Sequence, residues 1–279
     1  MKVAACDFDG TLLRGGEVST ADRAAIDEWR AAGHVFGIVT GRGVTTLLAA
    51  LKRCGPVPCD FVICNNGALI CDGQFREVCR AVLPEAARTV VLDHPVLQVC
   101  DQCLLFSGAE AYVLAGKAPY WIHPENRFSS LPTERARQLP LHQISVRYPD
   151  TVSAQAWAAA LAAAGEGLVE VHLSSICIDM TACRVNKTEG LRRLMRIRHW
   201  EGDVLVAGDD GNDLSMIRDF GGCAVSTATD EVRRAAVRVV DSVGQMLREQ
   251  IGDSRFGAGS RAGKSLLRHG RMLGVFSGQ

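Results

Sequence analysis

The sequence lacks an excess of charge of either sign, because 31 Lys and Arg residues balance 31 Asp and Glu residues to a formal net charge of zero. This balance favours neither a nucleic acid nor an anionic membrane surface as a partner. The sequence also lacks an apolar run long enough to span a bilayer, and its first residues lack the long apolar segment of a signal peptide. We therefore expect a cytoplasmic protein that binds neither nucleic acids nor membranes.

A regular cysteine framework is missing as well. The 11 cysteines are odd in number and do not show the short, repeated spacing of a disulfide scaffold, which favours reduced thiols. Cys100 and Cys103 have the spacing of metal ligands, but no second C-x-x-C or paired-histidine motif accompanies them. Zinc there would need His94, His123 or remote thiols to converge, so ordinary half-buried cysteines are the favoured interpretation.

What the sequence does contain is a repeated alternation of short apolar strands and helices. Strands are predicted over Val3–Phe8, Val35–Val39 and Phe61–Cys64, with helices from Ser19 to about Ala32 and over Val44–Cys54. Short connections between such elements imply right-handed crossovers and a parallel sheet. The alternation returns near the carboxyl end, with predicted elements at Lys187–His199, Val204–Ala207, Asp213–Arg218, Cys223–Ser226, Asp230–Ala236 and Val237–Val240.

Between these two parts the pattern changes. A hairpin with a two-residue turn at Asp72-Gly73 is predicted to join Ala68–Cys71 to Gln74–Val78. From about Leu83 to Cys183, helices mix with half-buried strands, as in an α+β unit with an antiparallel sheet. The predicted strands there are Gln143–Arg147, Leu168–Leu173 and Ser175–Met180, and Val152–Ala164 is a predicted helix.

These patterns predict an α/β protein with a Rossmann-like, doubly wound parallel sheet as its core and an inserted α+β cap domain. The core would comprise residues 1–82 and 184–252, and the cap residues 83–183. A basic, glycine-rich tail follows over residues 253–279, and we expect it to be flexible or loosely docked rather than in contact with another subunit or an anionic surface.

Polar side chains gather at the predicted carboxyl ends of three core strands. Asp7 and Asp9 follow the first strand, Thr40–Arg42 follow the second, and Gly208–Asp213 follow a late strand whose preceding helix opens with Lys187. In an open parallel sheet, ligands bind beyond these strand ends. Four separate segments therefore bring carboxylates, a hydroxyl, backbone amides and an ammonium group to one edge.

This collection of groups suits a metal ion and a phosphoryl group. Two carboxylates about 4 Å apart repel by roughly 4 kcal/mol at an effective dielectric constant near 20, and a hard cation such as Mg²⁺ removes that cost. Thr40, the Gly41 amide and Lys187 supply donors and a positive charge for phosphoryl oxygens. The alternative, that the carboxylates only cap a turn and a helix, is disfavoured because all four segments converge.

The chain resembles the haloacid dehalogenase superfamily, in its Cof-like phosphatase branch with a large type IIB cap. The motifs that carry the resemblance are D-F-D-G-T-L-L at Asp7–Leu13, T-G-R at Thr40–Arg42, N-N-G-A at Asn65–Ala68, N-K-T-E-G-L at Asn186–Leu191 and G-D-D-G-N-D at Gly208–Asp213. The resemblance implies a Rossmann-like core, Mg²⁺ and an aspartyl-phosphate intermediate.

The resemblance also implies catalytic roles. Asp7 would be the nucleophile that attacks phosphorus, and Asp9 would be the general acid for the leaving oxygen and then the base for water. Thr40 would hold the phosphoryl oxygens, and Lys187 would offset negative charge on the nucleophile and the phosphate. Covalent catalysis of this kind divides one difficult displacement into two easier ones.

Metal and substrate contacts are implied in the same way. Mg²⁺ would be held by Asp7, the Asp9 backbone carbonyl, Asp209, and Asp213 directly or through water. Substrate-binding residues are expected at Gly41, Arg42, Asn66 and Asn212. Two of these have alternatives, because Arg42 is nearly as well explained as an exposed structural arginine and Asn66 as part of a turn. Residues 118–127, a polar-aromatic stretch, are either an ordinary cap strand and turn or a contact for the leaving group.

We therefore expect a Mg²⁺-dependent phosphatase, monomeric or homodimeric, that acts on small phosphorylated metabolites such as sugar phosphates or phosphorylated cofactors. A phosphosugar mutase and a non-catalytic phosphometabolite sensor are the alternatives. Dehalogenation is disfavoured, because it requires the nucleophile but neither a leaving-group acid such as Asp9 nor this set of metal ligands.

Overall fold

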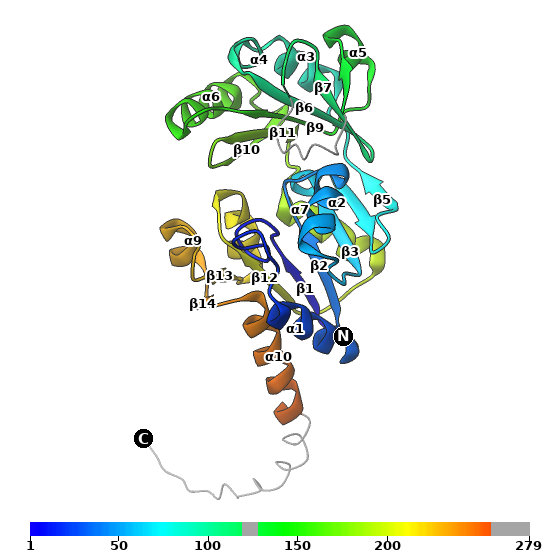
Figure 1. Ribbon diagram of the computed structural model, residues 1–279, viewed down its shortest axis with the longest axis vertical. Helices are drawn as coiled ribbons and strands as arrows, with labels where there is room; N and C mark the ends of the chain where they lie inside the picture. Colours follow the sequence, from blue (N-terminus) through cyan, green and yellow to red (C-terminus); the bar gives the residue numbers. More distant parts are fainter. Residues whose placement is uncertain (119–127, 258–279) are drawn as a thin grey trace, which may run out of the picture.

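A computed structural model describes residues 1–118 and 128–257 (Figure 1). The core sheet has eight strands in the order β14-β13-β12-β1-β2-β3-β4-β5. The six strands from β14 to β3 run parallel, and β4 and β5 extend the sheet in antiparallel fashion. The strands are β1 (Val3–Cys6), β2 (Val35–Val39), β3 (Phe61–Cys64), β4 (Leu69–Asp72), β5 (Glu77–Arg80), β12 (Val204–Gly208), β13 (Cys223–Val225) and β14 (Arg238–Val240).

Helices cover both sides of this sheet and complete the Rossmann-like α/β class expected from the sequence. They are α1 (Thr20–Ala31), α2 (Val44–Cys54), α7 (Lys187–Arg198), α8 (Leu214–Phe220), α9 (Asp230–Ala235) and α10 (Val243–Gly257), with single 3₁₀ turns η1 (Asn65–Gly67) and η2 (Gly211–Asp213). Side-chain caps define two helix starts, since Ser19 accepts from the Asp22 amide and Asn186 from the Glu189 amide, both at 3.0 Å. Their apolar faces bury one continuous core around the sheet.

A second sheet of six strands lies within residues 83–183, the segment that we call the cap. Its order is β10-β11-β9-β6-β7-β8, antiparallel except for the β7–β8 pair. The strands are β6 (Gln102–Ser107), β7 (Glu110–Leu114), β8 (Ser129–Leu131), β9 (Gln143–Arg147), β10 (Val169–Ser174) and β11 (Cys177–Ala182). The cap helices are α3 (Glu85–Asp93), α4 (Pro95–Val99), α5 (Thr133–Gln138) and α6 (Thr151–Ala164).

The cap helices lie on the side of this sheet that is remote from the core (Figure 1). They bury a separate apolar cluster, to which β9 contributes Ile144 and Val146. Since side chains alternate along a strand, Gln143, Ser145 and Arg147 point to the opposite face, toward the core. The polar face of the cap sheet is thus turned to the core.

Three local predictions differ from the structure. The Asp72-Gly73 hairpin does not have a two-residue turn, because the Asp72 side chain accepts from the amides of Gln74 (2.9 Å) and Arg76 (3.0 Å) and closes a longer loop. The strand expected over Ser175–Met180 is displaced to β11, since Ser175 has a left-handed backbone and belongs to the turn. Helix α10 continues across the expected boundary at residue 252 to Gly257.

The cysteines are all free thiols. Cys100 and Cys103 are buried in the cap, where the Cys100 thiol donates to the Leu97 carbonyl and His94 accepts from the Val96 amide as the cap of α4. His123, the stretch 119–127 and the basic tail from 258 onward lie outside the described residues. Within residues 1–118 and 128–257, no helix is long and apolar enough to cross a membrane.

Candidate active site

The carboxyl ends of β1, β2 and β12 meet beneath a cavity of about 730 Å³ between the core and the cap. The Asp7 amide donates to the Ala207 carbonyl at 2.9 Å, which continues the β1–β12 pairing and places Asp7 beside the Asp209–Asp213 loop. Predicted site residues that line the cavity are Asp7, Asp9, Thr40, Gly41, Arg42, Asp209 and Asn212. Asn66, Lys187 and Asp213 are buried directly behind them.

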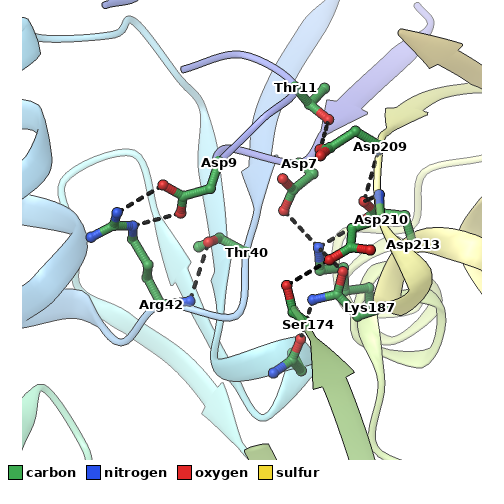
Figure 2. A network of polar contacts seen from close by, with 12 residues as sticks. Asp7, Asp9, Thr11, Thr40, Arg42, Ser174, Lys187, Asp209, Asp210 and Asp213 are labelled. Carbon is green, nitrogen blue, oxygen red and sulfur yellow. Dashed lines mark hydrogen bonds and ion pairs between the residues drawn. The ribbon is translucent and has the colours of Figure 1, made fainter. Parts of the chain in front are cut away.

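Lys187 is the buried centre of this site (Figure 2). Its Nζ lies 2.6 Å from Asp7 Oδ1, 2.7 Å from Asp213 Oδ1 and 3.3 Å from Asn212 Oδ1, and its side chain is 1% exposed. Burial alone would lower the pKa of Lys187, but the Asp213 and Asp7 carboxylates raise it above its ordinary value. The lysine is therefore charged at neutral pH and joins two carboxylates that come from opposite ends of the chain.

One ammonium group does not neutralise the acids around it. Burial raises the pKa of Asp7 well above its ordinary value despite Lys187, and burial also raises the pKa of Asp209 to about 6. Asp7, Asp209 and Asp213 each offer a ligand oxygen, and these atoms lie within 4.8 Å of one another. An all-oxygen set with excess negative charge fits a hard divalent cation. This is the one such three-residue set in the described part of the chain.

Two neighbours orient Asp209. Thr11 donates its hydroxyl to Asp209 Oδ1 at 2.5 Å, a contact that the sequence interpretation did not assign although Thr11 stands in the first motif. Gly10 has φ +84°, and a Cβ there would lie 2.2 Å from Asp209 Oδ2. The glycine after the two aspartates is thus required both by backbone conformation and by space.

Hydrogen bonds within the late loop fix Asp213. Its Oδ2 accepts from the amides of Asp209 (3.0 Å) and Asp210 (3.3 Å), while its Oδ1 faces Lys187. The turn η2 carries this carboxylate inward, and a Cβ on Gly208 would collide with it at 2.5 Å. The missing side chain at Gly208 therefore allows the Asp213 carboxylate to pack against the end of β12.

Arg42 is neither exposed nor directed only at the cavity. Its guanidinium makes a two-point ion pair with Asp9, with Nε to Oδ2 at 2.6 Å and Nη2 to Oδ1 at 2.7 Å. The Arg42 side chain is 7% exposed and that of Asp9 37%. Its backbone amide also donates to Thr40 Oγ1 at 3.1 Å. Arg42 therefore orients both Asp9 and Thr40, and the alternative of an exposed structural arginine is wrong.

Asn66 links the core to the cap. Its backbone is left-handed (φ +51°), its side chain is fully buried, and its Nδ2 donates to Asp179 Oδ2 (2.8 Å) and Gln143 Oε1 (3.2 Å). Its Oδ1 accepts from Asn212 Nδ2 at 3.2 Å. Because Asn212 also contacts Lys187, a continuous hydrogen-bond chain runs from the lysine to the cap sheet.

The cap touches the core at two further points. Gln143 Nε2 donates to the Gly41 carbonyl at 3.1 Å, and Ser174, at the β10–β11 turn, donates to Asp210 Oδ2 at 2.8 Å (Figure 2). The sequence interpretation missed Asp179 and Ser174, and it gave no separate role to Asp210, which stands in the late motif. Burial raises the pKa of Asp179 to about 6, against hydrogen bonds from Ser145 and Asn66. The strand alternation of β9 and β11 was the signal that could have identified this polar face.

A family model for haloacid dehalogenase-like hydrolases matches residues 4–245 of the chain. The chain is also 25% identical over 233 residues to the 5-amino-6-(5-phospho-D-ribitylamino)uracil phosphatase YbjI of Escherichia coli (strain K12), covering 79% of this chain and 83% of that protein.

Solved structures share the architecture. The HAD subclass IIB sugar phosphatase BT4131 has a TM-score of 0.77 at 19% identity, over 90% of this chain and 99% of that chain. A HAD/COF-like hydrolase from Plasmodium vivax has a TM-score of 0.77 at 20% identity, over 90% of this chain and 95% of that chain. At these identities the likeness concerns the fold.

Proposed function

The chain belongs to the haloacid dehalogenase-like hydrolase family, and we propose that it is a Mg²⁺-dependent phosphatase that hydrolyses phosphate monoesters of small metabolites through an aspartyl-phosphate. The observation that carries the proposal is the buried Lys187, which bridges Asp7 and Asp213 beneath a cavity of about 730 Å³. A carboxylate can attack a phosphate dianion only where positive charge offsets both reactants.

The metal would be held by Asp7, Asp209 and Asp213, with the Asp9 backbone carbonyl as a further oxygen ligand. When bound, it supplies Lewis-acid polarisation and neutralises charge on the phosphoryl oxygens. The oxygen-only donor set and its excess of negative charge support Mg²⁺. Lys187 then needs to balance only part of the acidic cluster.

In the first half-reaction, one Asp7 oxygen attacks phosphorus as the bond from phosphorus to the ester oxygen breaks. Thr40 Oγ1 and the Gly41 amide donate to the phosphoryl oxygens, and Asp9 gives its proton to the departing alkoxide. In the second, Asp9 takes a proton from water, whose oxygen attacks the same phosphorus and releases Asp7 and inorganic phosphate. Arg42 positions Asp9, which would be protonated when it acts as the acid and ionised, as in the observed ion pair, when it acts as the base.

The cap is proposed to cover the bound ester and to contact its leaving group. Its contacts with Gly41, Asn66 and Asp210 keep it over the strand ends and exclude bulk water there. Sugar or polyol phosphates are the preferred substrate class. The names of two relatives support this class, since one acts on a phosphorylated ribitylamino compound and another is a sugar phosphatase.

Phosphate release from a panel of monoesters, with Mg²⁺ and with chelator, tests the proposal. Mg²⁺-dependent turnover is expected, and Asp7→Asn should lower kcat by on the order of 10⁴-fold or more, since no covalent intermediate can form. Asp219→Asn, in a partly exposed position on α8, is the control and should leave turnover unaltered. Normal turnover by Asp7→Asn would refute the covalent mechanism, and transfer of the phosphoryl group to a second sugar hydroxyl would identify a mutase.

A further inference from the structure

The loop that supplies two of the three clustered acids is also a contact point for the cap. Along Gly208–Asp213, the carboxylates of Asp209 and Asp213 belong to the acidic cluster. The carboxylate of Asp210, which stands between them in sequence, instead accepts from the Ser174 hydroxyl of the cap at 2.8 Å (Figure 2). One short loop therefore joins the acidic cluster to the cap.

The cap meets this loop at the turn between β10 and β11. Besides the hydrogen bond from Ser174, the Leu173 carbonyl lies 3.8 Å from the point where a Cβ of Gly211 would lie. Ser174 and Asp210 are both only partly exposed, so part of their contact is shielded from bulk water. A hydrogen bond to a carboxylate is about twice as strong as one between neutral groups. The turn therefore restrains the position of Asp210.

Backbone hydrogen bonds connect Asp210 to Asp213. The Asp210 amide donates to Asp213 Oδ2 at 3.3 Å, and the Asp213 amide donates to the Asp210 carbonyl at 2.9 Å. Asp210 Oδ1 also accepts from the Gly211 amide at 2.8 Å, which fixes the start of η2. Because these bonds tie the two residues together, a displacement of Asp210 also displaces the Asp213 carboxylate.

Asp209 is supported differently. Its carbonyl accepts from the Thr229 amide at 2.9 Å and its carboxylate from the Thr11 hydroxyl at 2.5 Å, and both donors belong to the core. The loop is thus held by the core at Asp209 and by the cap at Asp210. Lys187 offsets only part of the negative charge of the cluster, so without a cation its carboxylates repel one another. The contact with the cap opposes movement of the loop away from the cluster.

We propose that Ser174 is a positioning residue that couples the cap to metal binding, because its hydrogen bond to Asp210 holds Asp213 where it can bind Mg²⁺. Such coupling is reciprocal, so Mg²⁺ in turn strengthens the contact of the β10–β11 turn with the core. The inference rests on the metal site of the proposed function and adds a role for the cap in the affinity of that site.

Calorimetric titration with Mg²⁺ alone tests the coupling without substrate. Ser174→Ala should raise the Kd for Mg²⁺ by about fivefold, the lower end of the usual range for coupled sites, since it removes a single contact. Ser174→Thr keeps a hydroxyl and should retain the wild-type Kd. Thr45→Ala is the matched control and should also retain it, because the Thr45 hydroxyl donates to the Ala109 carbonyl of the cap at 2.7 Å but does not touch the loop.

A double-mutant cycle tests whether Ser174 acts through Asp210. Ser174→Ala should weaken Mg²⁺ binding in the wild-type background and have no effect on the Kd in the Asp210→Ala background. Equal effects in the two backgrounds would overturn the assignment. Thermal unfolding of each variant establishes that it is folded.

Hydrogen–deuterium exchange measures the reciprocal effect and needs no substitution at Asp210. Mg²⁺ should slow amide exchange in the turn at residues 174–177 by about fivefold in the wild type but not in Ser174→Ala. The turn at Ala109, which contacts α2, is the internal control and should exchange at the same rate with and without Mg²⁺. Equal slowing of both turns would overturn the inference.

Phosphate release separates this inference from the proposed function. At saturating Mg²⁺, Ser174→Ala should recover most of the wild-type kcat, whereas a loss that Mg²⁺ does not restore would overturn the positioning role. If Ser174→Ala binds Mg²⁺ as tightly as the wild type, or if Thr45→Ala weakens binding equally, the coupling fails while Mg²⁺-dependent turnover still supports the phosphatase. If the coupling is observed but the wild type releases no phosphate from any monoester, the phosphatase fails and the coupling stands.

Discussion

Replacing Lys187 by Met is the most direct perturbation of the buried charge centre. The ammonium group lies 2.6 Å from Asp7 and 2.7 Å from Asp213, and both carboxylates are almost fully buried. Removing one partner from a buried ion pair leaves an uncompensated charge and costs about 3–5 kcal/mol. Two carboxylates lose the same partner here, so in the absence of metal we expect the free energy of unfolding to fall by at least about 3 kcal/mol.

Urea denaturation with chelator measures this loss, and the double variant Lys187→Met/Asp213→Asn tests its origin. In the wild-type background, Asp213→Asn replaces the carboxylate beside the ammonium by an uncharged amide and should lower the free energy of unfolding. In the Lys187→Met background, the same substitution removes a buried like-charge pair with Asp7 and should stabilise, so its effect on unfolding should reverse sign. The coupling energy is expected to be about 1–3 kcal/mol.

Mg²⁺ provides the second readout. The variant without the lysine retains the three acidic ligands, so adding Mg²⁺ should raise its Tm more than it raises the Tm of the wild type. An unchanged free energy of unfolding in chelator, together with additive effects of the two substitutions, would refute the view that Lys187 stabilises the fold by neutralising Asp7 and Asp213.

Three further predictions concern individual contacts. Arg42→Ala frees Asp9 from its two-point ion pair, so kcat should fall by roughly tenfold or more for alkyl phosphates and much less for p-nitrophenyl phosphate, whose leaving group needs little protonation. The pKa of Asp179 is raised from 3.8 to about 6, so its contribution to stability is present below about pH 4 and is lost as the pH rises through 6. Relative to Asp179→Asn, the free energy of unfolding of the wild type should therefore fall by at most about 3 kcal/mol between these pH values, and by less where water enters the cavity. Gly10→Ala should cost about 1–2 kcal/mol in urea denaturation and weaken Mg²⁺ binding measured by calorimetry, because it strains a left-handed backbone and displaces Asp209.

Matched controls separate these effects from general damage. Gly15 has φ +60° and open space around it, so Gly15→Ala should carry a similar backbone cost without loss of Mg²⁺ affinity. Equal Mg²⁺ affinities in the two glycine variants would contradict the role given to Gly10. Equal losses of kcat for alkyl and p-nitrophenyl phosphates would contradict the role given to Arg42. A pH-independent difference in unfolding free energy between wild type and Asp179→Asn would contradict the raised pKa of Asp179.

Residues of the core site were predictable because each directly follows a strand or opens a helix. Asp7, Thr40 and Asp209 follow β1, β2 and β12, and parallel pairing alone brings these ends together. Local capping and crossover rules therefore predicted both the Rossmann-like sheet and the convergence of its polar groups. Predicting this convergence did not require knowing which side chains contact one another.

Contacts that depend on register or on side-chain direction were not predictable in the same way. Alternation along β11 indicates which residues share a face with Asp179, but the pairing of β11 with β9 is what sets Asp179 opposite Ser145 at the cavity. Arg42 binds Asp9 because its long side chain turns along the strand ends, and Asp72 closes a longer loop through its own carboxylate. A sequence pattern specifies neither the direction of the Arg42 side chain nor the length of the loop that Asp72 closes.

The pairing of Val3 with Val204 has a consequence for the order in which the chain acquires structure. During synthesis the cap can collapse around its own apolar cluster before β12 has emerged, while β1 can pair with β2 at once but meets its second neighbour, β12, about two hundred residues downstream. A collapsed cap shortens the loop that must be closed, and each halving of that loop saves about 0.6 kcal/mol. Asp7 thus meets Lys187 and Asp213 only after α7 and β12 have been made, so we expect the capacity to bind Mg²⁺ to be gained later in folding than the structure of the cap.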